Sequence, residues 1–323
     1  MINYICERKF LSSANFVFTG ISQDSFQGVT VLIHPNQLFD GCIIYLLYNE
    51  LQEFIRLSRF IQNKYVLISG LSDFTVPYYS DYHRIDGTEL LRSEMLLAWY
   101  ALNITHEFPK LHHLPIGIPR CIPFLGSSFD VDKKDEPDFE EYIGWYNIST
   151  FTDMEWVYRR FSPTPDAILT RLKDKISEQK KLLYVGFTAC NSDRSNIAAN
   201  IGFRRALHNY IENQTSYTFQ SLRPWREYVE LLSQYKYTIE PFGRCIDGYR
   251  VWEALCLGVI PIVFRSPINE LHEKLPFLII DSFEQLQPEY LEKQYPLLLK
   301  RSYELDRLDM KYWLDKIKSH YNK

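Results

Sequence analysis

The chain has 323 residues, 46% apolar and 24% charged, which is enough for one large or two ordinary domains with a sizeable core. Its formal net charge of −4 argues against a general nucleic-acid binder, which needs a basic surface to neutralise phosphates. No apolar run reaches the roughly 18 residues of a transmembrane helix, although this leaves contact with a membrane surface open. The six cysteines are scattered outside metal-clip spacing, which predicts reduced thiols in a cytoplasmic protein.

Apolar runs alternate with helical patterns in the first part of the chain. Helices are expected over 41–61, with room for a short leading strand, and over 88–102, with Thr88 as N-cap. Alternation of this kind predicts a parallel sheet with helices on both faces. The expected strands cover 15–20, 29–34, 64–70 and 110–119.

An acidic, turn-rich segment at 127–153 lacks periodicity, and we interpret it as a linker or excursion. A second alternating series follows, so the whole chain predicts two Rossmann-like halves. Its first helix, over 163–179, is expected to have Thr164 as N-cap and Pro165 as its first residue. The later elements are strands over 180–189, 235–241, 260–264 and 275–281, and helices over 196–211, 224–234, 248–258 and 283–321.

The stretch YTIEPFGRCIDGYRVWEALCLGVIPIVF, residues 237–264, carries the clearest chemical signal. A right-handed crossover places the N-terminus of its helix at the carboxyl edge of the sheet, where ligands bind. Gly243 and Gly248 permit sharp turns and close approach, and the first helical turn favours an anion. Arg250 offers a forked donor to phosphate, and Glu253 can accept two hydrogen bonds from a ribose diol.

The same two charged residues also fit an exposed i, i+3 ion pair worth a few tenths of a kcal/mol, and their spacing leaves both interpretations open. The stretch has neither a G-x-G-x-x-G pattern nor a Walker lysine, which disfavours dehydrogenases and P-loop enzymes. Asp130 and Asp132 form a D-x-D pair, but their charged, Ser-rich surroundings favour a solvated loop over a cation site. His112 and His113 are adjacent on a strand and point to opposite sides, so we expect no metal site there.

This stretch resembles the exostosin-like glycosyltransferases, whose carboxyl-terminal halves carry a pattern similar to SKF-x-LSP-x-G-x-G-x-D-x-HR-x-WEAL-x-x-G-x-IPIV. Two departures bear on sugar or base preference, because Tyr249 replaces the usual His and Cys245 replaces the second loop glycine. Weaker matches occur in the family's order at KYVLISGLSDFTVPY, WYALNITHEFPKLHHLPIGIPR and KLLYVGFTACNSDRSNI, so that the resemblance covers roughly residues 60 to 290.

The resemblance implies a GT-B fold, with two Rossmann-like domains facing a cleft. The implied units are an acceptor domain at 1–165, a nucleotide-sugar domain at 166–300, and a helix at 301–323 that packs back on the first domain. It also implies inverting transfer from a UDP- or GDP-sugar to a glycan or glycoprotein hydroxyl, with no metal or other cofactor required. Without a membrane anchor, the expected setting is the cytoplasm of a bacterium or the host cell of a virus.

The resemblance also suggests roles for individual residues. Arg250, with Arg194 as a second candidate, would stabilise the leaving diphosphate, and Glu253 would hold the ribose. Asp73, which follows a buried strand, is the expected base; an Asx-turn is the alternative for this residue. His83 and His106 are further candidates for the base.

Two alternatives to an active transferase of this kind remain open at the level of sequence. One is a nucleotide-sugar or carbohydrate-binding protein that has lost catalysis. The other is a DNA-modifying glycosyltransferase, which the acidic net charge disfavours.

Overall fold

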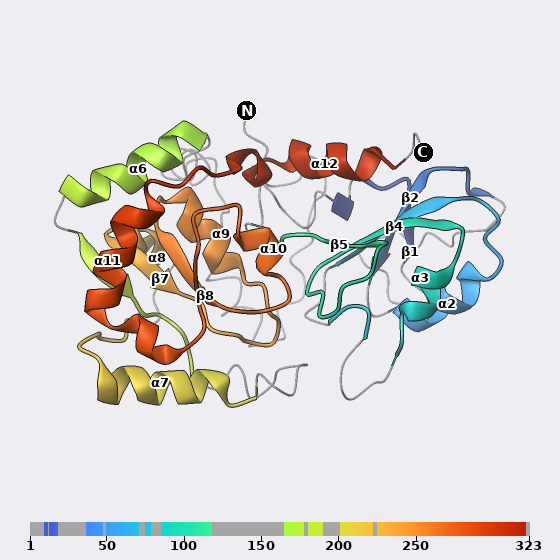
Figure 1. Ribbon diagram of the computed structural model, residues 1–323. Helices are drawn as coiled ribbons and strands as arrows, with labels where there is room; N and C mark the ends of the chain where they lie inside the picture. The colour runs from blue at the N-terminus through green and yellow to red at the C-terminus, as the bar shows by residue number, and fades with distance from the viewer. Residues whose placement is uncertain are drawn as a thin grey trace, which may run out of the picture.

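The protein has an α/β fold built on two separate parallel sheets, seen in a computed structural model (Figure 1). One sheet belongs to the amino-terminal part of the chain and the other to the carboxyl-terminal part. The residues that the structure describes are 10–18, 37–70, 75–78, 85–117, 165–177, 180–189, 201–221 and 225–320, apart from positions 12, 48 and 49.

The first sheet has five described strands in sequential order, all parallel to their neighbours. No reversal of strand order occurs among them, so the described part of this sheet has no topological switch point. The strands are β1 (Phe16–Phe18), β2 (Cys42–Leu47), β3 (Tyr65–Gly70), β4 (Leu96–Ala101) and β5 (Leu111–His113), with helices α2 (Leu51–Ser58) and α3 (Thr88–Arg92) between them.

The two faces of the first sheet have different partners. Alternate residues such as Ile44 and Leu67 pack against α2 and α3 in one apolar cluster. Their neighbours in the strands, such as Ile43 and Val66, face a second cluster that includes residues of the carboxyl-terminal half. Both described helices of this sheet therefore cover the same face, and the other face is covered by the rest of the molecule. Helix α12, from the end of the chain, is among the elements that pack on this other face, so helices cover both faces of the first sheet as well.

The second sheet has four described parallel strands, again in sequential order. Helices α6, α7 and α11 pack on one face, and α8 and α9 on the other. The elements are α6 (Pro165–Ser177), β6 (Lys181–Tyr184), α7 (Phe203–Gln214), α8 (Trp225–Leu232), β7 (Tyr235–Ile239), α9 (Tyr249–Cys256), β8 (Ile260–Phe264), α10 (Asn269–His272), β9 (Leu278–Ile280), η5 (Phe283–Leu286), α11 (Pro288–Leu298), η6 (Leu305–Leu308) and α12 (Met310–Lys318).

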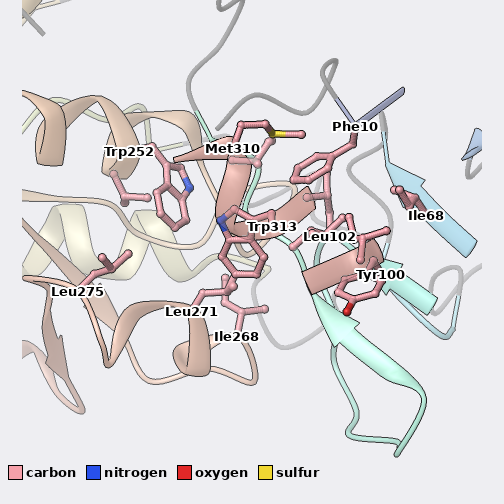
Figure 2. Packing of buried hydrophobic residues seen from close by; sticks show 14 of the residues in the cluster. Phe10, Ile68, Tyr100, Leu102, Trp252, Ile268, Leu271, Leu275, Met310 and Trp313 are labelled. Carbon is pink, nitrogen blue, oxygen red and sulfur yellow. The ribbon is translucent and has the colours of Figure 1, made fainter. Parts of the chain in front are cut away.

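Among the residues that the structure describes, one apolar cluster contains residues of both halves. Figure 2 shows Trp252 of α9 and Trp313 of α12 in this cluster, together with Tyr100 from the first sheet and Leu271 from α10. Helix α12 lies against the first sheet, and the Tyr100 hydroxyl donates to the Lys316 carbonyl oxygen at 3.2 Å. The sheets thus share buried apolar surface, and the last helix lies between them (Figure 1).

One helix prediction in the first half was wrong over part of its length. The segment 88–102 is the short helix α3 followed by β4, whereas the segment 41–61 is the leading strand that the prediction allowed, β2, followed by helix α2. Both strands are apolar at almost every position because parallel strands are buried on both faces, and this removes the alternation that distinguishes a strand from a buried helix. Thr88 is the first helical residue; Gly87 occupies the N-cap position.

Several other predictions fall at or beyond the limits of the described residues. Helix α6 begins at Pro165, as predicted, whereas Thr164, the strand over 29–34 and the segment 127–153 lie outside the described residues. None of the helices among the described residues is long and apolar enough to cross a bilayer.

Candidate functional site

The crossover predicted between residues 235 and 264 is present. Strand β7 ends at Ile239, α9 begins at Tyr249, and β8 follows from Ile260. The helix ends where Gly258 takes a left-handed conformation, with φ of 66°. Gly248 is extended at the N-cap and provides no side-chain cap. The loop between β7 and α9 follows the end of a parallel strand, so it lies at the carboxyl edge of the sheet.

A buried ion pair holds the beginning of that loop. Arg204 of α7 is 5% exposed, and its Nη2 lies 2.9 Å from Glu240 Oε1. The same guanidinium donates to the carbonyl oxygens of Pro241 and Phe242 at 3.1 and 3.0 Å. Burial lowers the pKa of Arg204 and the neighbouring carboxylate opposes this effect; arginine stays charged in either case. Arg204 therefore fixes the path of the chain as it leaves β7.

The two glycines of the loop lie close to the side chains of this ion pair. A Cβ atom at Gly243 would lie 2.9 Å from Arg204 Nη2, and one at Gly248 would lie 3.4 Å from Glu240 Oε1. Gly243 thus leaves room for the buried arginine, so its absence of a side chain has a reason within the protein itself. Neither glycine has a positive φ angle.

Arg250 lies on the first turn of α9, above the ends of two strands. Its Nη1 donates to the carbonyl oxygen of Gly186, just past β6, and lies 3.8 Å from Glu240 Oε2. The Arg250 side chain is 28% exposed, against 11% for Glu240. Two guanidinium groups thus flank one carboxylate, and the cluster of Arg204, Glu240 and Arg250 has a net charge of one positive unit. Arg250 is the member of this cluster that solvent reaches most readily.

Glu253 and Tyr249, the other charged and aromatic residues predicted in this stretch, face the protein interior to different degrees. Glu253 is 2% exposed and interacts electrostatically with Tyr228 and Cys256, where burial and this carboxylate together raise the pKa of both groups. Tyr249 is half-buried against the apolar cluster that joins the two halves. The expected contact between Glu253 and a ribose is not tested by these observations and stays a prediction.

Asp73 and Arg194 lie outside the described residues, as do His83, Asp130 and Asp132. The chain is described again from Thr75, and Val76 pairs with Ile104 in a parallel bridge beyond the end of β4. The segment that follows Asp73 therefore lies at the carboxyl edge of the first sheet.

The three described histidines that the sequence singled out occupy separate environments. His106 is exposed, near the Tyr78 ring and within 2.9 Å of the Thr105 hydroxyl. His112 packs against Tyr100 and His320, and burial lowers its pKa to about 4. His113 is buried, and burial lowers its pKa as well. Within the described ranges, no group of three or more His, Cys, Asp or Glu residues is arranged to hold a metal ion.

Arg204 and Glu240 are the site residues that sequence reasoning missed. Glu240 follows β7 directly, in the sequence Ile-Glu-Pro, and a carboxylate just past a buried strand is a signal that could have been noticed. Arg204 gave no such signal, because it is one of two adjacent arginines on an amphipathic helix and only the fold shows that it is buried.

The chain matches no protein-family model, and a comparison with curated proteins finds no relative.

Proposed function

We propose that the protein is an inverting, metal-independent glycosyltransferase of GT-B architecture, which transfers a sugar from a nucleoside diphosphate to a glycan or glycoprotein hydroxyl. The observation that carries the proposal is the position of Arg250. Its partly exposed guanidinium lies on the first turn of α9, at the carboxyl edge of a parallel sheet and beside a second, buried arginine. This position suits a diphosphate, which carries charge on several oxygens.

In this proposal the donor diphosphate binds over the amino terminus of α9. As the bond between the sugar and the diphosphate breaks, negative charge increases on the leaving oxygens, and Arg250 and the helix N–H groups stabilise it. The net positive charge of the cluster of Arg204, Glu240 and Arg250 favours the same step. Arg194 stays the second candidate for this role.

The acceptor is proposed to bind at the carboxyl edge of the first sheet. Asp73, three residues before Val76, would take the proton from the acceptor hydroxyl as the sugar is transferred. Support comes from the segment beginning at Thr75, which lies beside Ile104 at that edge. A cleft between the two edges would bring the donor and the acceptor together.

A thermal-shift panel of UDP- and GDP-sugars, run with a chelator present, tests this proposal. We expect at least one of them to raise the melting temperature of the wild-type protein, because a ligand at about 100 times its Kd adds about 2.7 kcal/mol of stability. Arg250→Ala should weaken that binding about tenfold or more, since a charge-assisted hydrogen bond contributes roughly 1.5–3 kcal/mol.

Arg265→Ala is the matched control. Arg265 also lies in the second half, but its side chain is 60% exposed and pairs with Asp281 at 2.5 Å. Equal nucleotide affinity in Arg250→Ala and Arg265→Ala would overturn the role of Arg250. A protein that binds nucleotide sugar through Arg250, yet neither hydrolyses nor transfers it with any acceptor tested, would be the catalytically silent alternative.

A further inference from the structure

Asn103 connects the first half of the molecule to the loop that precedes α9. It lies two residues past β4, is 2% exposed, and has a left-handed backbone with φ of 50°. Its Oδ1 accepts hydrogen bonds from the backbone N–H groups of Ile246 and Asp247, at 3.2 and 3.1 Å. A side chain of the first half thus holds two consecutive peptide groups of the second.

Asp247 makes the reciprocal connection. It is 2% exposed, and its Oδ2 accepts a hydrogen bond from the backbone N–H of Ile116, just past β5, at 2.8 Å. The indole N–H of Trp252 donates to Asp247 Oδ1 at 3.0 Å. Each half therefore contributes one buried polar side chain that binds the other half's backbone, and we call this pair the Asn103–Asp247 clamp.

The clamp lies between the two places where the proposed chemistry occurs. On one side, the Asn103 carbonyl oxygen accepts from the Val76 N–H at 3.1 Å, which ties the clamp to the segment that follows Asp73. On the other side, Asp247 is three residues before Arg250 and bonds to Trp252 in the same helix. The hydrogen bonds of the clamp thus run from the carboxyl edge of the first sheet to the first turn of α9.

We infer that Asn103 is a positioning residue. It fixes the loop before α9 and so holds Arg250 at a constant position relative to the carboxyl edge of the first sheet, where the acceptor is proposed to bind. The role in catalysis rests on the proposed function; the fixing of the loop does not. An arginine side chain held by a rigid loop loses less conformational entropy on binding an anion than one on a mobile loop. A displacement of such a group by about 1 Å weakens binding and slows the reaction.

Asn103→Gly removes the amide without straining the backbone, because glycine accepts a positive φ angle. We expect the peptide that contains Ile246 and Asp247 to exchange its amide hydrogens for deuterium about tenfold faster in this variant, without any ligand. Asn103→Asp keeps an acceptor oxygen and also tolerates this conformation, so it should restore protection to within about threefold of the wild type.

Asn269→Ala is the matched control for a purely structural effect. Asn269 is 5% exposed, and its Oδ1 accepts from the Ser266 N–H at 2.7 Å, so it holds a loop within its own half. Exchange at Ile246 and Asp247 should change less than about twofold in this variant. Unchanged exchange in Asn103→Gly, or an equal increase in Asn269→Ala, would overturn the inference.

Calorimetric titration with UDP and GDP distinguishes a failure of the positioning role of Asn103 from a failure of the proposed function. If the wild type binds either nucleotide, Asn103→Gly should bind it about tenfold more weakly and Asn269→Ala within about twofold of the wild type. Equal affinity in wild type and Asn103→Gly would overturn the positioning role. If the wild type binds neither nucleotide nor any nucleotide sugar, the proposed function fails, and the exchange experiment alone decides whether Asn103 fixes the loop.

Discussion

Asp247 is a buried carboxylate whose surroundings act on its ionisation in opposite directions. Burial raises its pKa to about 7 from the ordinary 3.8, although the N–H groups of Ile116, Trp252 and Gly248 favour the ionised form. The folded state therefore binds a proton more tightly than the unfolded state between these two values. This group's contribution to stability is largest below pH 4 and declines as the pH rises toward 7.

Asp247→Asn tests that sign. Relative to the variant, the wild type should lose stability as the pH rises from about 5 to 7, by at most about 1.4 kcal/mol of unfolding free energy per pH unit. Above about pH 8 the difference between the two proteins should be constant. Urea denaturation of both proteins at matched pH values measures it. A difference that is constant over this range would show that the carboxylate stays ionised in the folded protein.

At the scale of the element, α9 is the helix that carries Arg250. Its carboxyl-terminal end is fixed by one glycine. Gly258 has φ of 66°, and a Cβ atom added to it would lie 2.5 Å from the Cβ of Arg171 in α6. Close approach between α6 and the end of α9 thus requires glycine for two reasons, the backbone angle and the packing.

Gly258→Ala should lower the free energy of unfolding by more than Gly202→Ala. Gly202 has a similar φ of 75° but nothing within 4 Å of an added Cβ, so its substitution costs only the backbone strain of about 1 kcal/mol. We expect an additional cost of about 1–3 kcal/mol at Gly258 from overpacking, measured by chemical denaturation. Equal losses in the two variants would mean that α6 moves away freely.

At the scale of the whole molecule, the two sheets are joined by one apolar cluster. Met310 and Trp313 of α12 are 0% and 2% exposed in this cluster, between residues of the first sheet and residues of α9 and α10 (Figure 2). Halves that share buried apolar surface lose it together when either unfolds, so the fold should behave as one cooperative unit.

Trp313→Ala should lower the free energy of unfolding by about 3–5 kcal/mol, because a large buried ring is replaced by a cavity. Phe60→Ala is the control, since Phe60 is 71% exposed and should change stability by less than about 1 kcal/mol. Scanning calorimetry should show one transition for the wild type and a single, lower transition for Trp313→Ala. Two separate transitions in the wild type would contradict the shared core.

Local patterns in the sequence were sufficient to locate the elements that carry the site. The apolar run after Gln234, the helical spacing from Tyr249 and the glycine at 258 predicted β7, α9 and the end of that helix, because hydrophobic period and glycine position report local conformation directly. The same reasoning failed at β4, where a continuous apolar run is equally compatible with a strand and with a buried helix.

The sequence by itself therefore determined a chain of alternating strands and helices, with Arg250 on the first turn of a crossover helix. Only the tertiary structure decided which groups surround that arginine. The bonds between Asn103 and Asp247 span 144 positions, and the ion pair between Arg204 and Glu240 spans 36. Such partners depend on how the sheets are placed against each other, and this placement comes from packing between distant apolar surfaces, which local spacing does not encode.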